Sequence, residues 1–264
     1  MPGPTKRSPA NARSVTSAQK TLIVAADRLS AAVDRLQFGL PVTHVYNPLA
    51  YARKAHHQFL RMAQPTSTRV LFLGMNPGPW GMAQTGVPFG QIDAVKDWIG
   101  IDAVVDKPEN EHPKRPIEGL ACKRSEVSGQ RLWGLFRDRF ETAQVFFQEH
   151  FVVNYCPLVF MESTGRNRTP DKLPPTERRP LDEVCDEHLR TVINILKPAF
   201  LVGVGAYAEG CLKRAVATLQ ASADADIPVV TRILHPSPAS PAANKGWHAI
   251  ATKELIAAGV WESS

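Results

Sequence analysis

The residues best suited to chemistry lie in a loop of residues 74–81, whose sequence is Gly-Met-Asn-Pro-Gly-Pro-Trp-Gly. Asn76 is the one side chain in this loop that can hydrogen-bond through both a carbonyl and an amide. Prolines fix φ and glycines permit positive φ, so we expect a stiff loop that exposes its backbone to a ligand. Taken alone, the loop is better explained by a tight turn in which Asn76 caps the backbone.

Three more loops of unusual composition each follow a short apolar run. They cover residues 154–158 (NYCPL), 203–207 (GVGAY) and 235–240 (HPSPAS). Two of them begin with a side chain suited to binding or catalysis, Asn154 and His235. In α/β folds, ligands bind beyond the carboxyl ends of the strands. Four such loops at one edge of a sheet therefore predict a binding site.

The apolar runs before these loops predict the strands that position them. Each run is short and almost wholly apolar, which is typical of a strand buried on both faces of a parallel sheet. Segments with helical periodicity separate the runs. This alternation predicts an α/β fold with right-handed crossovers, a three-layer α/β/α sandwich with a central, mostly parallel four-stranded sheet. The expected strands are 68–74, 150–154, 199–205 and 227–234, and the expected helices are 17–38, 49–62, 130–140, 181–196, 206–221 and 247–258.

We expect a single domain, residues 17–264, behind a basic, disordered tail of residues 1–16. Of the 264 residues, 44% are hydrophobic, which suffices for one sizeable core and excludes wholesale disorder. The segment 102–124 contains three prolines and is expected to be a surface loop. The net charge of +6 favours an anionic partner such as nucleic acid without proving one.

The apolar runs also bear on where the protein works. None approaches the roughly 20 residues of a membrane span, so no membrane association is expected. The first 20 residues carry four basic side chains, no acid and no apolar stretch, which does not fit a secretory signal. We expect a monomer that is not secreted. It would lie in the cytoplasm or nucleoid of a bacterium, or in the nucleus of a eukaryote.

No metal or organic cofactor is expected. The four cysteines lie at least 26 residues apart, whereas zinc and iron–sulfur sites usually take two ligands from one tight turn. In the loop 203–207 the next glycine is Gly210, so the spacing of a dinucleotide-binding loop fails. Cys156 and His235 could form a thiol hydrolase pair. Cys156 precedes Pro157 in an apolar stretch, however, which favours a buried, inert thiol.

The first loop and its continuation resemble the first active-site motif of uracil-DNA glycosylases. The resemblance is closest to the single-strand-selective monofunctional branch of that superfamily. It spans roughly residues 69–259 and implies the uracil-DNA glycosylase fold. The matching stretches, in the family's order, are 74–90 (GMNPGPWGMAQTGVPFG), 125–129 (SEVSG), 154–158 (NYCPL), 235–238 (HPSP) and 243–247 (ANKGW).

The resemblance implies hydrolysis of the N-glycosidic bond of uracil in single- and double-stranded DNA during base-excision repair. A glycosylase must take its base out of the duplex, because the C1′–N1 bond cannot be reached inside the stack. By resemblance, Phe89 stacks on the flipped uracil and Asn154 pairs with its N3–H and O4. His235 contacts O2, where negative charge develops, and Asn76 positions the attacking water. No lysine matches a catalytic position, so strand cleavage is not implied.

The resemblance also implies a pocket beside position 5 of the base and a wedge loop for DNA. Met75, Gly78 and Met82 shape the pocket, which implies activity on 5-hydroxymethyluracil. Vertebrate members carry an arginine where this chain has Ala239, so weaker duplex binding is expected. Two alternatives stay open, a mismatch-type uracil or thymine glycosylase and a catalytically silent DNA-lesion-binding relative. The residues expected to contact DNA are Ser237 (also through its backbone amide), Pro238, Ala239, Ser240, Asn244 and Lys245.

Overall fold

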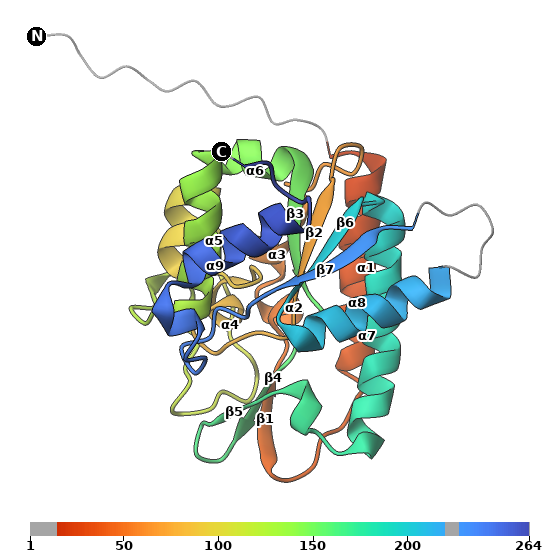
Figure 1. Cartoon of the computed structure of the whole chain (residues 1–264). Helices are drawn as coiled ribbons and strands as arrows, with labels where there is room; N and C mark the ends of the chain where they lie inside the picture. Colours follow the sequence, from red (N-terminus) through yellow and green to blue (C-terminus); the bar gives the residue numbers. More distant parts are fainter. Residues whose placement is uncertain (1–14, 220–226, 264) are drawn as a thin grey trace, which may run out of the picture.

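Two β-sheets organise the protein, whose computed structural model describes residues 15–219 and 227–263. The larger sheet has four parallel strands in the order β3-β2-β6-β7 (Figure 1). The smaller sheet is antiparallel, in the order β1-β4-β5. The strands are β1 (Val42–Tyr46), β2 (Val70–Gly74), β3 (His150–Asn154), β4 (Val159–Glu162), β5 (Asn167–Arg168), β6 (Phe200–Val204) and β7 (Val229–Ile233).

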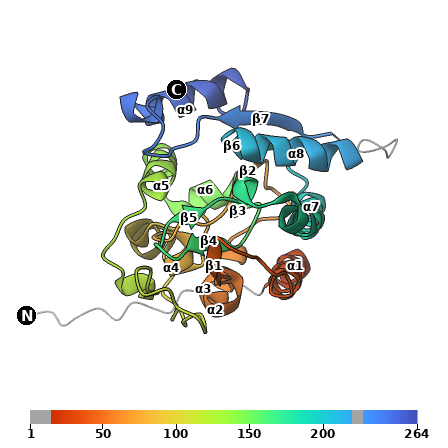
Figure 2. The same ribbon diagram turned by 90° about the horizontal axis from the view of Figure 1, so that it is seen from below.

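Helices cover both faces of the four-stranded sheet. Figures 1 and 2 show α1, α7 and α8 on one side of it and α5, α6 and α9 on the other. The predicted three-layer α/β/α sandwich is therefore confirmed. The helices are α1 (Ser17–Val33), α2 (Pro48–Tyr51), α3 (Arg53–Leu60), α4 (Met82–Thr85), α5 (Val127–Phe140), α6 (Ala143–Glu149), α7 (Pro175–Leu196), α8 (Ala206–Leu219) and α9 (Trp247–Ala257).

The four predicted parallel strands are confirmed to within two residues at each end. All five residues of β2 are buried, as are the first four of the edge strand β3, because helices cover both faces of these strands. A strand enclosed on both faces has no polar side to alternate with, which is why unbroken apolar runs identified these strands.

Four predicted helices have clearly different bounds in the structure, and one of them is α5, which begins at Val127 rather than at residue 130. The helix expected over 17–38 ends at Val33, where α1 gives way to a turn. The helix expected over 49–62 is divided at Ala52, whose φ of −101° and ψ of 23° separate α2 from α3. Helix α7 begins at Pro175, six residues before the predicted start, because prolines in its first two turns obscured the helical pattern. The last two residues expected in α8 lie outside the described residues.

The smaller sheet was not predicted. Residues 102–124, predicted to be a surface loop, are mostly exposed but pack against this sheet at a few buried positions. This segment is largely irregular, but His112, Ile117 and Cys122 in it are buried. The Tyr46 hydroxyl of β1 accepts a 2.6 Å hydrogen bond from the His112 N–H and donates to the Arg115 carbonyl at 2.9 Å. The segment therefore packs against the smaller sheet and completes a second hydrophobic cluster there.

Other expectations concern the tail, the cysteines and the membrane. Residues 1–14 of the expected tail lie outside the described residues. All four cysteines are buried free thiols. Among the described residues, no helix is long and apolar enough to span a membrane, and no group of three or more His, Cys, Asp or Glu side chains is arranged to hold a metal ion.

Candidate active site

The candidate site lies at the carboxyl edge of the parallel sheet, where the loops after β2, β3, β6 and β7 meet. Strand register sets this arrangement, since Gly74 at the end of β2 pairs with Asn154 at the end of β3. The loop after β6 approaches the loop after β7 at Gly205. A Cβ there would lie 3.1 Å from the Cβ of His235, and φ at Gly205 is +93°, which favours glycine.

Asn76 makes a tertiary contact rather than capping its own turn. Its Nδ2 donates to the Leu158 carbonyl at 3.1 Å, across 82 residues of sequence, and more weakly to the Pro77 carbonyl at 3.4 Å. Two backbone bonds of 2.9 Å, from the N–H groups of Tyr155 and Cys156, tie the loop after β3 to the same segment. The Nδ2 bond orients the amide and leaves Oδ1 as an acceptor that no described residue uses.

Asn154 and Phe89 are brought together by the absence of a side chain at Gly74. A Cβ on Gly74 would overlap Asn154 Oδ1 and would lie 2.7 Å from Cζ of the Phe89 ring. Asn154 Nδ2 donates to the Met82 sulfur at 3.3 Å, while Oδ1 is buried and has no partner among the described residues. A buried acceptor without a donor costs about 1–3 kcal/mol, and such groups are typical of ligand sites.

The backbone of Phe89 is strained, with φ of 54° at a non-glycine residue. Neighbouring side chains hold this turn in place. Thr85 Oγ1 donates to the Gly90 carbonyl at 3.1 Å, and Trp133 Nε1 donates to the Pro88 carbonyl at 3.1 Å. Helix α5 approaches so closely that a Cβ on Gly129 would overlap the Phe89 carbonyl oxygen. The position of the ring is thus fixed by structure around it.

His235 faces the same space, with its ring centroid 6.4 Å from that of Phe89. Its Nδ1 accepts a 3.1 Å hydrogen bond from the Ser237 N–H. Burial lowers the pKa of His235 below its ordinary value, so the ring is neutral at pH 7. A neutral imidazole that accepts at Nδ1 carries its proton on Nε2, which makes Nε2–H the donor available to a ligand.

The loop of residues 236–245, which was predicted to act as the DNA wedge and is called the wedge loop below, is held by hydrogen bonds within itself and from Arg131. Arg131 of α5 donates to the Pro236 carbonyl at 3.1 Å and to Asn244 Oδ1 at 2.9 Å. Asn244 Nδ2 donates to the Pro238 carbonyl at 2.9 Å. The backbone amide of Ser237, expected to bond to phosphate, is instead engaged by His235. Pro238, Ala239, Asn244 and Lys245 are exposed, and Ser237 and Ser240 are half-buried.

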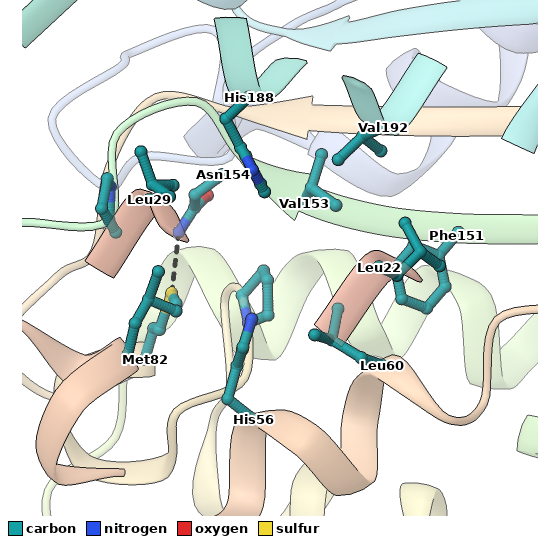
Figure 3. Close-up of a pocket in the computed structure, with 13 residues that line it drawn as sticks. Leu22, Leu29, His56, Leu60, Met82, Phe151, Val153, Asn154, His188 and Val192 are labelled. Carbon is teal, nitrogen blue, oxygen red and sulfur yellow. Dashed lines mark hydrogen bonds between the residues drawn. The ribbon is translucent and has the colours of Figure 1, made fainter. Parts of the chain in front are cut away.

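A small cavity of about 30 Å³ lies behind Asn154 (Figure 3). His56 and His188 contribute its polar lining besides Asn154, and burial lowers the pKa of each to about 4, so both are neutral. The space holds about one water molecule, which is too little for a pyrimidine. A base must therefore reach Asn154 from the side of Phe89 and His235.

The pocket residues expected from the sequence occupy the first loop and its continuation. Met75 and Gly78 are half-buried, and Met82 is buried against Asn154. Sequence reasoning assigned no role to Glu126 or Arg131. Glu126 lies directly behind Gly78, where a Cβ would lie 2.6 Å from its Oε2. Glu126 belongs to the quoted SEVSG motif, but no pattern in the sequence indicated what either residue contacts.

Comparison with known proteins bears on the family and the fold of the chain. Residues 61–256 match the family model described as the uracil DNA glycosylase superfamily. The chain is 47% identical over 233 residues to the "single-strand selective monofunctional uracil-DNA glycosylase" of Rattus norvegicus, covering 88% of this chain and 82% of that protein. The Bos taurus counterpart is 46% identical, with 88% and 84% covered. The crystal structure of wild-type Pedobacter heparinus SMUG2 superposes with a TM-score of 0.61 over 89% of this chain and 97% of that one, at 15% identity, which supports the fold alone.

Proposed function

The chain belongs to the uracil-DNA glycosylase superfamily, and from that premise we propose that it hydrolyses the N-glycosidic bond of uracil in DNA during base-excision repair. One observation carries the proposal: an unpartnered amide oxygen on Asn154, the Phe89 ring and the Nε2–H of His235 all face one space at the sheet edge. These three groups match the acceptor, stacking surface and donor that a flipped uracil requires.

Base flipping comes first, because the bond to be broken is buried in the stack. Phe89 offers a stacking surface worth about 1–3 kcal/mol for a nucleic-acid base. Because Thr85, Trp133 and Gly129 hold the Phe89 turn, the ring is in place before the base arrives. Extrusion is easiest from single strands and mispairs, so we expect both single- and double-stranded substrates, with single strands favoured.

Asn154 distinguishes uracil from cytosine. Its Oδ1 accepts from N3–H of uracil and its Nδ2, now against the Met82 sulfur, donates to O4. Cytosine presents an acceptor at N3 and a donor at N4, so the fixed amide would face like groups at both positions. Each unsatisfied buried group costs about 1–3 kcal/mol, which excludes cytosine without any steric block.

His235 and Asn76 act on the bond itself. As the C1′–N1 bond breaks, its electron pair moves to the base and negative charge develops on O2, where Nε2–H of His235 donates. A preorganised donor of this kind contributes several kcal/mol to the transition state. Asn76 Oδ1 accepts from a water that attacks the cationic C1′, and the proton of that water passes to solvent. Because an amide is a weak base, the bond breaks largely before the water attacks.

The remaining assignments follow from the same pose. Met75, Gly78 and Met82 border position 5 of the base, and 5-hydroxymethyluracil is a second substrate. The exposed Pro238 and Ala239 enter the gap left by the flipped base, and Lys245 contacts phosphate. All these side chains come from one chain, so a monomer suffices. The reaction takes place where the genome lies, in the nucleus of a eukaryote or the nucleoid of a bacterium.

A panel of four oligonucleotides tests this function. Single strands that carry one uracil, cytosine, thymine or 5-hydroxymethyluracil in the same context are incubated with the protein and EDTA, and the free base is quantified. We expect uracil and 5-hydroxymethyluracil to be released, with strand scission only after hot alkali. Release of thymine from T·G duplexes at a comparable rate would support the mismatch-type alternative instead.

A further inference from the structure

Glu126 places a carboxyl group directly behind the first loop, and two glycines make room for it. A Cβ on Gly78 would lie 2.6 Å from Glu126 Oε2, and a Cβ on Gly81 would overlap the same atom. Any side chain at either glycine would therefore displace the carboxyl. The close approach at both positions shows that loop and carboxyl are fitted to each other.

The carboxyl has no hydrogen-bond partner in the part of the chain that the structure describes. Oε2 is buried, and no described donor reaches it. Arg115 and Arg124 lie over the Trp80 ring of the same loop, at 5.2 and 4.5 Å from its centroid, and neither forms an ion pair with Glu126 among the described residues. Burial raises the pKa of Glu126 to about 7, so the group is partly protonated at neutral pH and can then donate as well as accept.

The pose of the base brings its position 5 toward this carboxyl, an argument that rests on the proposed function. His235 takes O2 and Asn154 takes N3–H and O4. Met82, whose sulfur touches Asn154 Nδ2, borders the O4 side. The next ring atom after C4 is C5, on the side away from His235. Gly81 directly precedes Met82, and Gly81 and Gly78 both abut the Glu126 carboxyl. We infer that the substituent on C5 points toward these glycines and the carboxyl.

We propose that Glu126 determines which 5-substituents the site accepts, by hydrogen bonding to a hydroxyl-bearing group such as hydroxymethyl. A 5-methyl group, as in thymine, fills the space beside the carboxyl without offering a hydrogen bond, so a polar group stays unpaired against an apolar substituent. Uracil has only hydrogen at this position and leaves the carboxyl as it is in the free protein. The preferred substrates are therefore pyrimidines with a polar or absent 5-substituent.

The test compares kcat/KM for 5-hydroxymethyluracil, uracil and thymine in the wild type and in two variants. Glu126→Met, similar in length but without hydrogen-bonding groups, is expected to lower the 5-hydroxymethyluracil-to-uracil ratio roughly 10- to 100-fold and to raise the thymine-to-uracil ratio. Glu126→Gln keeps a donor and an acceptor and should hold the first ratio within about threefold of wild type. Glu118, an exposed glutamate that precedes Glu126 in the chain, provides a matched control, and Glu118→Met should change neither ratio.

An unchanged ratio in Glu126→Met, with all substrates slowed together, would overturn the proposal and leave Glu126 as a support for the loop. If that variant does not fold, a comparison of two substrates in the wild type still tests the proposal. Its kcat/KM for 5-hydroxymethyluracil should exceed that for 5-ethyluracil, which has the same shape without the hydroxyl, and equal values would refute the proposal. Failure of the wild type to release uracil would contradict the proposed function instead.

Discussion

At the scale of single residues, the protonation of His235 decides what the site can do. Two features keep the ring neutral, its burial and the Ser237 N–H that donates to Nδ1. Protonation would add a hydrogen to Nδ1, which would then face the Ser237 N–H and disturb the loop that follows. The neutral ring is therefore the active form, with Nε2–H as its donor.

The rate of uracil release should depend on pH, because only the neutral form of His235 is expected to be active. Because the pKa of folded His235 lies below 6.5, the neutral form dominates above that value and is lost only at more acidic pH. We expect the single-turnover rate on a uracil-containing single strand to be level near neutral pH and to fall on acidification, with a midpoint below pH 6.5. His235→Leu should lower the rate by about 10²-fold or more and remove the acid limb.

Glu126 has a pKa of about 7, so its titration must be distinguished from that of His235 as the cause of the acid limb. The acid limb should persist in Glu126→Gln, which cannot titrate at position 126. A midpoint at or above pH 6.5 that persists in Glu126→Gln would contradict the assignment of a neutral, buried imidazole to the active enzyme.

The sequence predicted which residues form the site but not how each is held. Asn76, Phe89, Asn154 and His235 were predicted from the motifs that contain them. The strain at Phe89 was not predictable, because a positive φ at a non-glycine residue is imposed by tertiary contacts. Glu126 was missed for a similar reason, because its place in the site is defined by its contact with Gly78, which lies 48 positions earlier in the chain.

At the scale of elements, α5 braces the site along its first two turns. Glu126 precedes the helix, Gly129 admits the Phe89 carbonyl, and Arg131 holds the wedge loop through the Pro236 carbonyl and Asn244. The predicted helix began only at residue 130. Its true first turn was hidden because Val127 is exposed and Gly129 is a poor helix former that serves close packing instead.

Arg131→Ala should loosen the wedge loop. Hydrogen bonds from a charged donor contribute about 1.5–3 kcal/mol each, but this loop keeps its other internal bonds. We therefore expect kcat/KM to fall about 5- to 30-fold on a U·G duplex and less on a single strand, because only the duplex requires the wedge. The exposed Arg137 on the same helix offers the control, since Arg137→Ala should affect both substrates alike. An equal loss on both substrates in Arg131→Ala would contradict this role.

The strands could be predicted because burial dictates their composition, whereas the smaller sheet could not. Strand β1 is five residues long and half exposed, and β5 has only two residues, so neither carries a clear pattern. Both strands are defined by their pairing with β4, which for β1 is a contact across more than 100 residues of sequence. The prolines and charges of segment 102–124 suggested a surface loop, and nothing in its sequence indicated that it packs on this sheet.

At the scale of the whole molecule, the fold gathers the chemistry at one edge. The parallel sheet brings the carboxyl ends of four strands together at one edge, and the helices cover the two faces of the sheet rather than that edge (Figure 1). The net charge of +6 favours approach to DNA but does not select a base. In the function that we propose, base selection depends on a few polar groups at this edge, namely Asn154 Oδ1, His235 Nε2 and the Glu126 carboxyl.

The most direct test of this account is single-turnover release of uracil from a single-stranded oligonucleotide by the wild type and by Asn76→Ala. Because Asn76 positions the water, its loss should lower the rate by about 10²-fold or more without preventing folding. Asn194→Ala, which removes an exposed amide on α7, should leave the rate unchanged. Wild-type release of uracil, lost in Asn76→Ala alone, is the predicted result. Equal rates in both proteins would contradict the role of Asn76, and DNA binding without release by the wild type would contradict enzymatic function.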